Sequence, residues 1–84
     1  MIPDLLLEKG DKAIIVEVKR PSNHWDRRVR EGIEQLKRYL AATDLTQGIL
    51  FIPAIDPTSK ITLRNRTFVL SDKTRQIAVV SPGR

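Results

Sequence analysis

The chain has 84 residues and a formal net charge of +5, with 15 lysine and arginine residues against 10 aspartate and glutamate residues. This length predicts one small domain with a modest core, residues 1–84, made of residues 1–53 and a β-rich basic part, 60–84. The absence of cysteine excludes a disulfide framework and a thiolate metal site. No apolar stretch has the length of a membrane span and no secretory signal follows Met1, so we expect a cytoplasmic protein without membrane contact.

Two apolar segments near the N-terminus, Leu5–Leu7 and Ala13–Val18, predict a β-hairpin, because a short glycine-containing break separates them. Gly10 and Asp11 serve as a two-residue loop, with glycine supplying the positive φ of a tight turn. Leu5 then faces Val16 across the hairpin. A loop with one extra residue would break this direct pairing.

The same register places Asp4 opposite Glu17, and Lys19 shares their face because side chains alternate along a strand. Two opposed carboxylates destabilise a sheet unless something offsets their repulsion. Mg²⁺ would do so, since it binds carboxylate oxygens together with water and phosphate. The alternative is a surface hairpin in which Lys19 forms a salt bridge with the two acidic residues.

The segment Trp25–Ala42 predicts an amphipathic helix. Its apolar residues recur at helical spacing and form one narrow stripe, made of Trp25, Val29, Ile33, Leu36 and Leu40. Ser22 or Asn23 is the expected N-cap. Gly32 is unfavourable inside a helix unless it permits a close approach to the sheet.

The segment Gln47–Ile52 predicts a strand parallel to Ala13–Lys19, and its continuous apolar run is typical of a strand buried on both faces. Residues 54–59 are expected to form a loop. Three short strands are expected beyond it, joined by turns at 64–66 and 71–74, over the segments Ile61–Leu63, Thr67–Leu70 and Gln76–Val80.

The positive charge is concentrated near the C-terminus. Residues 1–59 contain nine basic and nine acidic side chains, whereas residues 60–84 contain six basic ones and Asp72 as the sole acidic one. Such asymmetry favours contact with nucleic acid phosphates, although a solvated basic surface gives the same pattern. The candidate phosphate contacts are Arg20, Lys60, Arg64, Arg66, Lys73 and Arg75.

The N-terminal two-thirds resembles the PD-(D/E)xK nuclease superfamily. The resemblance rests on Pro3-Asp4, Glu17-Val18-Lys19, the helix segments Gln35-Leu36 and Tyr39-Leu40, and the strand Gly48–Ile52, in that order. Restriction, phage-defence and replication–repair nucleases of this superfamily look equally similar. Family members usually carry a helix before the first strand, and the expected fold lacks it because Met1 stands two residues before Pro3.

The resemblance implies roles for individual residues. Asp4, Glu17 and the Val18 carbonyl would bind Mg²⁺ or Mn²⁺, and Lys19 would position the attacking water and stabilise charge on the phosphate. Gln35 matches a helix glutamine that lines the site in several relatives. The other interpretation of Gln35 is an ordinary residue at the border of the helix stripe.

These observations predict an α/β (α+β) domain with a restriction endonuclease-like core: a mixed sheet and one main crossover helix. The expected function is Mg²⁺-dependent hydrolysis of DNA phosphodiester bonds, in restriction, defence or repair. The alternative is a catalytically inactive nucleic-acid-binding or assembly module. A homodimer, or membership of a larger nuclease assembly, is compatible with either function.

Overall fold

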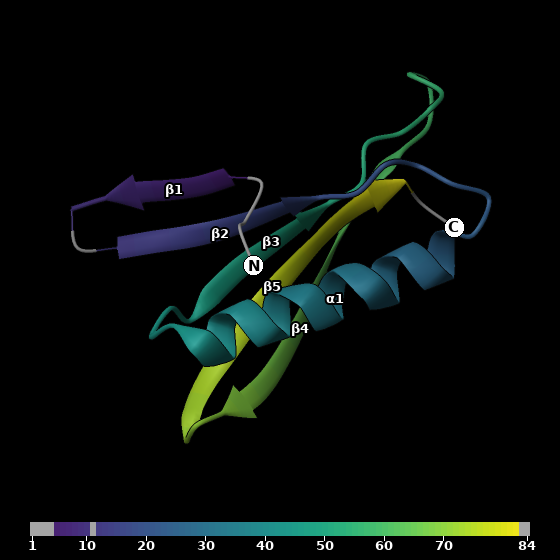
Figure 1. Cartoon of the computed structure of the whole chain (residues 1–84). Coiled ribbons are helices and arrows are strands. Elements are labelled where there is room, and N and C mark those ends of the chain that lie inside the picture. Colours follow the sequence, from purple (N-terminus) through teal and green to yellow (C-terminus); the bar gives the residue numbers. More distant parts are fainter. Residues whose placement is uncertain (1–4, 11, 83–84) are drawn as a thin grey trace.

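The computed structural model describes residues 5–10 and 12–82. They form one helix and five strands, in the order β1 (Leu5–Lys9), β2 (Lys12–Val18), α1 (Trp25–Ala42), β3 (Gln47–Phe51), β4 (Ile61–Leu70) and β5 (Lys73–Pro82). The strands form one mixed sheet in the spatial order β1-β2-β3-β5-β4, and α1 lies across one face of it (Figure 1). The architecture is therefore the expected mixed α+β fold with a single crossover helix.

The N-terminal hairpin has the predicted register. Leu5 pairs with Val16 and Leu7 pairs with Ile14, and Gly10 has a positive φ of 63° at the turn. Glycine suits this turn because it adopts positive φ without steric cost. The remaining residues of the prediction, Asp4 and Asp11, lie outside the described residues.

Strands β2, β3 and β5 run parallel to one another. Their carboxyl ends therefore meet at one edge of the sheet, and the chain leaves β2 at this edge to begin α1. The βαβ unit predicted from Ala13–Lys19 and Gln47–Ile52 is thus confirmed. In open sheets of this kind, ligands bind beyond the carboxyl ends of the strands, which makes this edge the first place to look for a site.

The C-terminal part differs from the prediction of three short strands. It forms one hairpin of two ten-residue strands, in which Arg64 pairs with Val79, Asn65 with Ala78 and Arg66 with Ile77. The predicted turn at 64–66 is therefore wrong. The actual turn is at Ser71 and Asp72, whose φ angles of 53° and 62° are those of a tight hairpin turn. β5 also extends beyond the predicted segment Gln76–Val80, from Lys73 to Pro82.

The hydrophobic core lies between α1 and the sheet. It combines the helix stripe with one face of β2, β3 and β5, and its fully buried members include Ile15, Leu36, Leu40, Leu50 and Ile77. A Cβ atom added at Gly32 would lie 2.4 Å from Leu50 Cδ1, and one at Gly48 would lie 3.4 Å from Leu36 Cδ2. Glycine at position 32 thus permits the close approach of helix and sheet that the sequence predicted.

The start of α1 also differs from the prediction. His24 occupies the N-cap position and makes no side-chain cap bond. Ser22 Oγ instead accepts a hydrogen bond from the His24 amide at 2.9 Å, which tightens the loop before the helix. Neither Ser22 nor Asn23 is therefore the N-cap residue.

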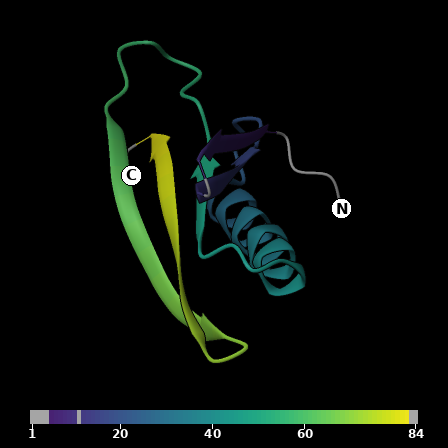
Figure 2. The same ribbon diagram turned by 90° about the vertical axis from the view of Figure 1, so that its left-hand side faces the viewer.

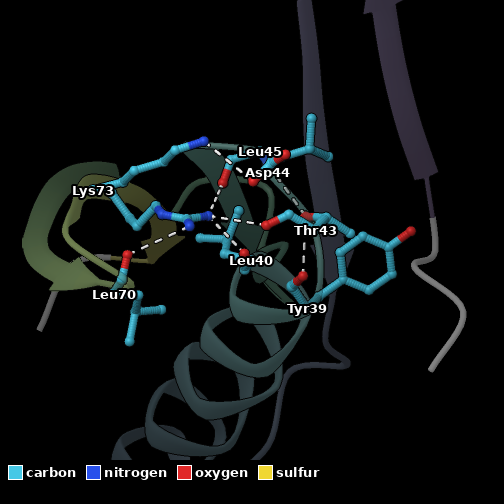
Figure 3. A network of polar contacts seen from close by, with 8 residues as sticks. Tyr39, Leu40, Thr43, Asp44, Leu45, Leu70 and Lys73 are labelled. Atoms are coloured by element: carbon cyan, nitrogen blue, oxygen red, sulfur yellow. Dashed lines mark hydrogen bonds and ion pairs between the residues drawn. The ribbon is translucent and has the colours of Figure 1, made fainter.

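The other end of α1 is closed by a buried arginine, Arg75, whose carbonyl partners Leu40, Thr43 and Leu45 are labelled in Figure 3. The last helical turn contains no basic residue, although its carbonyls lack intrahelical donors. Arg75 of β5 supplies donors instead: its guanidinium bonds the Leu40 carbonyl at 2.6 Å, the Thr43 carbonyl at 3.3 Å and the Leu45 carbonyl. A side chain from a distant strand thus caps the helix.

No described element covers the opposite face of the sheet, which we call the open face (Figures 1 and 2). Its exposed apolar side chains are Leu5, Leu7, Val18, Phe51, Ile61, Leu63 and Val69. The prediction that β3 is buried on both faces is therefore wrong, since Phe51 is 37% exposed. No helix among residues 5–10 and 12–82 is long and apolar enough to cross a membrane.

Candidate active site

The strand β2 carries Glu17 near its carboxyl end, and Lys19 follows the strand directly. Ile15 belongs to the core beneath α1, so Glu17 and Lys19, at the same parity, also lie on the helix face. The Lys19 amide donates to the Phe51 carbonyl at 3.0 Å, which continues the pairing with β3 past the end of β2. The backbone therefore fixes both residues at the carboxyl edge of the sheet.

The two side chains form a shielded ion pair. Lys19 Nζ lies 3.8 Å from Glu17 Oε1, and the side chains are only 16% and 12% exposed. Opposite charges that are partly withdrawn from water interact more strongly than an exposed pair. At 3.8 Å they are still beyond hydrogen-bond length, so the ammonium group keeps hydrogen-bonding capacity for a third group. A salt bridge between Lys19 and Glu17 is what the alternative interpretation, a surface hairpin without a metal, predicted, but the low exposure of the pair differs from a hairpin that faces water.

Gln35 lies on the flank of α1 that faces β2. Lys37 Nζ lies 5.2 Å from the centre of the Phe68 ring, so the flank of α1 that carries Lys37 faces β4. The helical period places Gln35 on the opposite flank. Gln35 shares that flank with Arg28 and Tyr39. The Gln35 Oε1 atom is buried and has no hydrogen-bond partner within the described part of the chain.

The contacts of Gly32 and Gly48 show where Gln35 lies along the helix axis relative to Glu17. Gly32 approaches Leu50, which pairs with Glu17, and Leu36 approaches Gly48, which pairs with Ile15. Because a helix rises about 1.5 Å per residue, Gln35 lies about 4.5 Å along the helix from the level of Glu17, on the Ile15 side.

Arg28 lies about one turn from Gly32 in the other direction, toward the carboxyl edge where Lys19 is found. Its guanidinium is 3.9 Å from Glu31 on the same helix. Sequence analysis did not single out Arg28, which the helical period places on the same flank as Gln35 and nearer the carboxyl edge. Its spacing of seven residues from Gln35, two helical turns, is the signal that places both on one flank.

The described residues contain no group of three or more histidine, cysteine, aspartate or glutamate side chains that could hold a metal ion. Glu17 is the carboxylate of the candidate site, and Asp4, the second predicted ligand, lies outside the described residues. The donors of the candidate site are oxygens: the Glu17 carboxylate and the Val18 carbonyl at the end of β2, and the Gln35 amide oxygen, which has no partner among the described residues. Such a donor set fits a hard cation such as Mg²⁺ in kind.

The predicted phosphate contacts fall into three groups. Arg64 and Arg66 point to the helix side of β4, and the Arg64 guanidinium lies 5.7 Å from the centre of the Trp25 ring. Arg20 and Lys60 are exposed in loops beside the carboxyl edge. Lys73 is remote from these residues and forms an ion pair of 3.1 Å with Asp44.

The prediction that Arg75 contacts nucleic acid is wrong. Its side chain is 1% exposed, and its guanidinium donates to the carbonyls at the end of α1. A buried arginine with these partners cannot reach a phosphate.

A shallow pocket of about 210 Å³ lies at the carboxyl edge, between the loop before α1 and the loop after β3. Its lining is mainly apolar, with Trp25 and Ile52, and Asp56 lies at one side. The Thr58 amide and hydroxyl donate to the Asp56 carboxylate at 2.9 and 2.8 Å. These hydrogen bonds lower the pKa of Asp56 and keep a negative charge at this edge.

Comparisons with known proteins do not identify a family. No protein-family model matches the chain, and neither a curated protein nor a solved structure matches it.

Proposed function

We propose that the chain is a metal-dependent nuclease that hydrolyses DNA phosphodiester bonds, with a PD-(D/E)xK, restriction endonuclease-like core. Restriction, defence and DNA repair are the proposed settings. The observation that carries the proposal is the shielded pair of Glu17 and Lys19 at the carboxyl edge, separated by 3.8 Å. A carboxylate and an ammonium group held side by side, partly out of water, are the groups that such a reaction requires.

In the proposed site, the Glu17 carboxylate, the Val18 carbonyl and Asp4 would hold Mg²⁺ or Mn²⁺. The bound metal would polarise the phosphate and lower the pKa of water. Asp4 enters the proposal because it directly precedes β1, whose first residue Leu5 pairs with Val16. Oxygen ligands and a small number of carboxylates are what Mg²⁺ accepts in proteins.

Lys19 has the part of an electrostatic stabiliser. Negative charge builds on the phosphate oxygens as water attacks, and a fixed ammonium group lowers the energy of that state. The partial burial of Lys19 increases the effect, because surrounding water screens the charge less. Gln35 would orient the attacking water through its unsatisfied amide oxygen, and Arg28 would bind a neighbouring phosphate.

The DNA backbone would approach along the carboxyl edge and the β4 side of the helix. Arg20 and Lys60 are exposed beside this edge, and Arg64 and Arg66 extend the positive surface on β4. Contacts of this kind hold the backbone without reading its sequence. Lys73 lies outside this surface because it is at the turn of the β4–β5 hairpin, away from the carboxyl edge, and Arg75 is excluded by its burial.

Calorimetric titration of Mn²⁺ into the metal-free protein tests the site. The variant Glu17→Gln should lose binding, whereas Glu8→Gln should keep it, because Glu8 is an exposed carboxylate of the same hairpin. Cleavage of plasmid, linear and branched DNA should disappear in parallel. Equal metal binding and equal cleavage by Glu17→Gln and the parent would refute the proposal.

The second candidate is a nucleic-acid-binding or assembly module without catalysis. It is favoured by the single carboxylate that the described part of the site contains. In that case DNA binding would be independent of metal and would weaken with salt as phosphate contacts do. Arg66→Ala would reduce the salt dependence, while Glu17→Gln would leave DNA affinity unchanged.

A further inference from the structure

The open face carries a broad apolar surface. Six large apolar side chains on four of its strands are between 37% and 65% exposed: Leu5, Leu7, Val18, Phe51, Ile61 and Leu63. The strand register places Val18, Phe51, Val80 and Leu63 in one row across the sheet. Monomeric proteins rarely expose continuous apolar surfaces of this extent, and such surfaces mark interaction sites.

The open face is also almost free of charge. Along the five described strands, side-chain alternation puts only Lys9 and Lys12 on this side, and these two pair with each other at the hairpin turn. No acidic side chain of these strands points to it. A chain with a net charge of +5 therefore holds nearly all its charges elsewhere. Two copies can meet at this face without like-charge repulsion, whereas a charged partner finds no complement there.

The size of the face suits a second copy. Five strands about 4.8 Å apart, each at least five residues of about 3.3 Å, give a flat footprint on the order of 400 Å², before the relief of the side chains is counted. The ten-residue strands β4 and β5 extend it further. Stable interfaces bury on the order of 800 Å² of accessible surface per partner, about twice this flat footprint, so the longer strands and the relief of the side chains must supply the remainder.

We propose that the chain forms a symmetric homodimer in which the open faces of two copies stack on each other. Two sheets pack face to face about 10 Å apart, with their side chains interdigitating. A two-fold axis makes the same patch serve both copies. The six exposed apolar side chains then become the second core of the dimer. The proposal is independent of the nuclease activity, since Glu17 and Lys19 lie on the helix face.

Sedimentation equilibrium over a wide concentration range tests the dimer. The parent chain should sediment as a dimer, and Phe51→Glu and Leu63→Glu should each weaken association by about tenfold or more. Leu63 is 65% exposed, so a charge there leaves the monomer folded even if Phe51→Glu does not fold. Circular dichroism confirms the fold of each variant.

The matched control is Ile55→Glu. Ile55 is 77% exposed and apolar, but it lies in the loop after β3 rather than on the sheet, so its substitution should leave the dimer intact. A parent chain that is monomeric at every concentration would overturn the proposal and assign the open face to another occupant, such as an amphipathic helix. A dimer that neither substitution on the open face weakens would also overturn it, because association would then use a strand edge.

Discussion

The two ends of the helix–sheet interface each hold a shielded basic side chain, and the two differ in their partners. At one end, Arg75 is 1% exposed and donates to backbone carbonyls that the fold itself brings together. At the other end, Lys19 is 16% exposed and faces Glu17 at 3.8 Å, beyond hydrogen-bond length. Burial alone therefore does not distinguish a basic side chain that stabilises the fold from one that can act on a ligand. The terminal nitrogens of Arg75 are held by backbone carbonyls of the fold, although its Nε has no partner among the described residues, whereas the Lys19 ammonium faces a carboxylate at a distance that leaves room for a ligand.

The largest effect is expected at the Lys19 end. Lys19→Met should lower the rate of DNA cleavage by about a hundredfold or more, because it removes a fixed charge that stabilises the developing negative phosphate. The urea midpoint should also fall, because Glu17, 12% exposed, loses the opposite charge beside it. Lys12→Met, at the exposed start of the same strand, is the control and should cleave normally. Normal cleavage by Lys19→Met would show that Lys19 has no role in the reaction.

At the Arg75 end the effect should be on stability and not on DNA binding. Arg75→Met should lower the free energy of unfolding by about 2–4 kcal/mol, because several carbonyls at the end of α1 lose their donors. Urea denaturation measures this. Lys73→Met breaks only the exposed pair with Asp44 and should cost less than about 1 kcal/mol. An equal loss of unfolding free energy in Arg75→Met and Lys73→Met would mean that the bonds of Arg75 to the carbonyls at the end of α1 do not stabilise the fold.

Between the two ends, Gly32 sets the separation of helix and sheet. Gly32→Ala improves helix propensity by about 1 kcal/mol, but its Cβ would lie 2.4 Å from the buried Leu50 side chain. We expect overpacking to exceed the propensity gain and to leave a net loss of about 1–2 kcal/mol. Glu34→Ala on the exposed side of α1 is the matched control. A stabilised Gly32→Ala protein would show that Leu50 moves aside freely.

The smallest effect concerns the Asp56 loop beside the Lys19 end. The hydrogen bonds from Thr58 lower the pKa of Asp56 in the folded protein below its ordinary value of 3.8. The carboxylate therefore contributes to loop stability above that value, and the contribution disappears as the pH falls through the folded pKa. Carboxyl NMR titration should show the shift in the parent, and Thr58→Val should reduce it. An Asp56 that titrates at 3.8 or above would contradict the observed turn.

Elements with a clear local period were predictable. The alternation of β2 fixed the parity of Glu17 and Lys19, and the helix stripe fixed the bounds of α1 at Trp25 and Ala42. The polar run from Arg64 to Arg66 was interpreted as a turn because turns favour such residues. It is a strand because each residue has a partner on β5, and a partner provided by a later strand leaves no local signal.

The role of Arg75 was hidden for the same reason. Its carbonyl partners Leu40, Thr43 and Leu45 lie 30 to 35 residues earlier in the chain. One signal was present: the last turn of α1 contains no basic residue, so its carbonyls required a donor from elsewhere. The exposure of β3 on one face could not be predicted either, because an apolar run in the sequence does not show whether one or both faces of the strand are covered.

The sheet order has a consequence for the route by which this chain folds. β5, the last described strand, lies between β3 and β4, and it supplies Ile77 and Val79 to the core. The core therefore cannot be completed during synthesis until β5 has been made. β4 pairs only with the strand that follows it, so the β4–β5 hairpin forms by local contacts first and then docks on β3 as a unit. That docking and the pairing of β2 with β3 across α1 are the long-range steps of the sheet, and they should limit the folding rate.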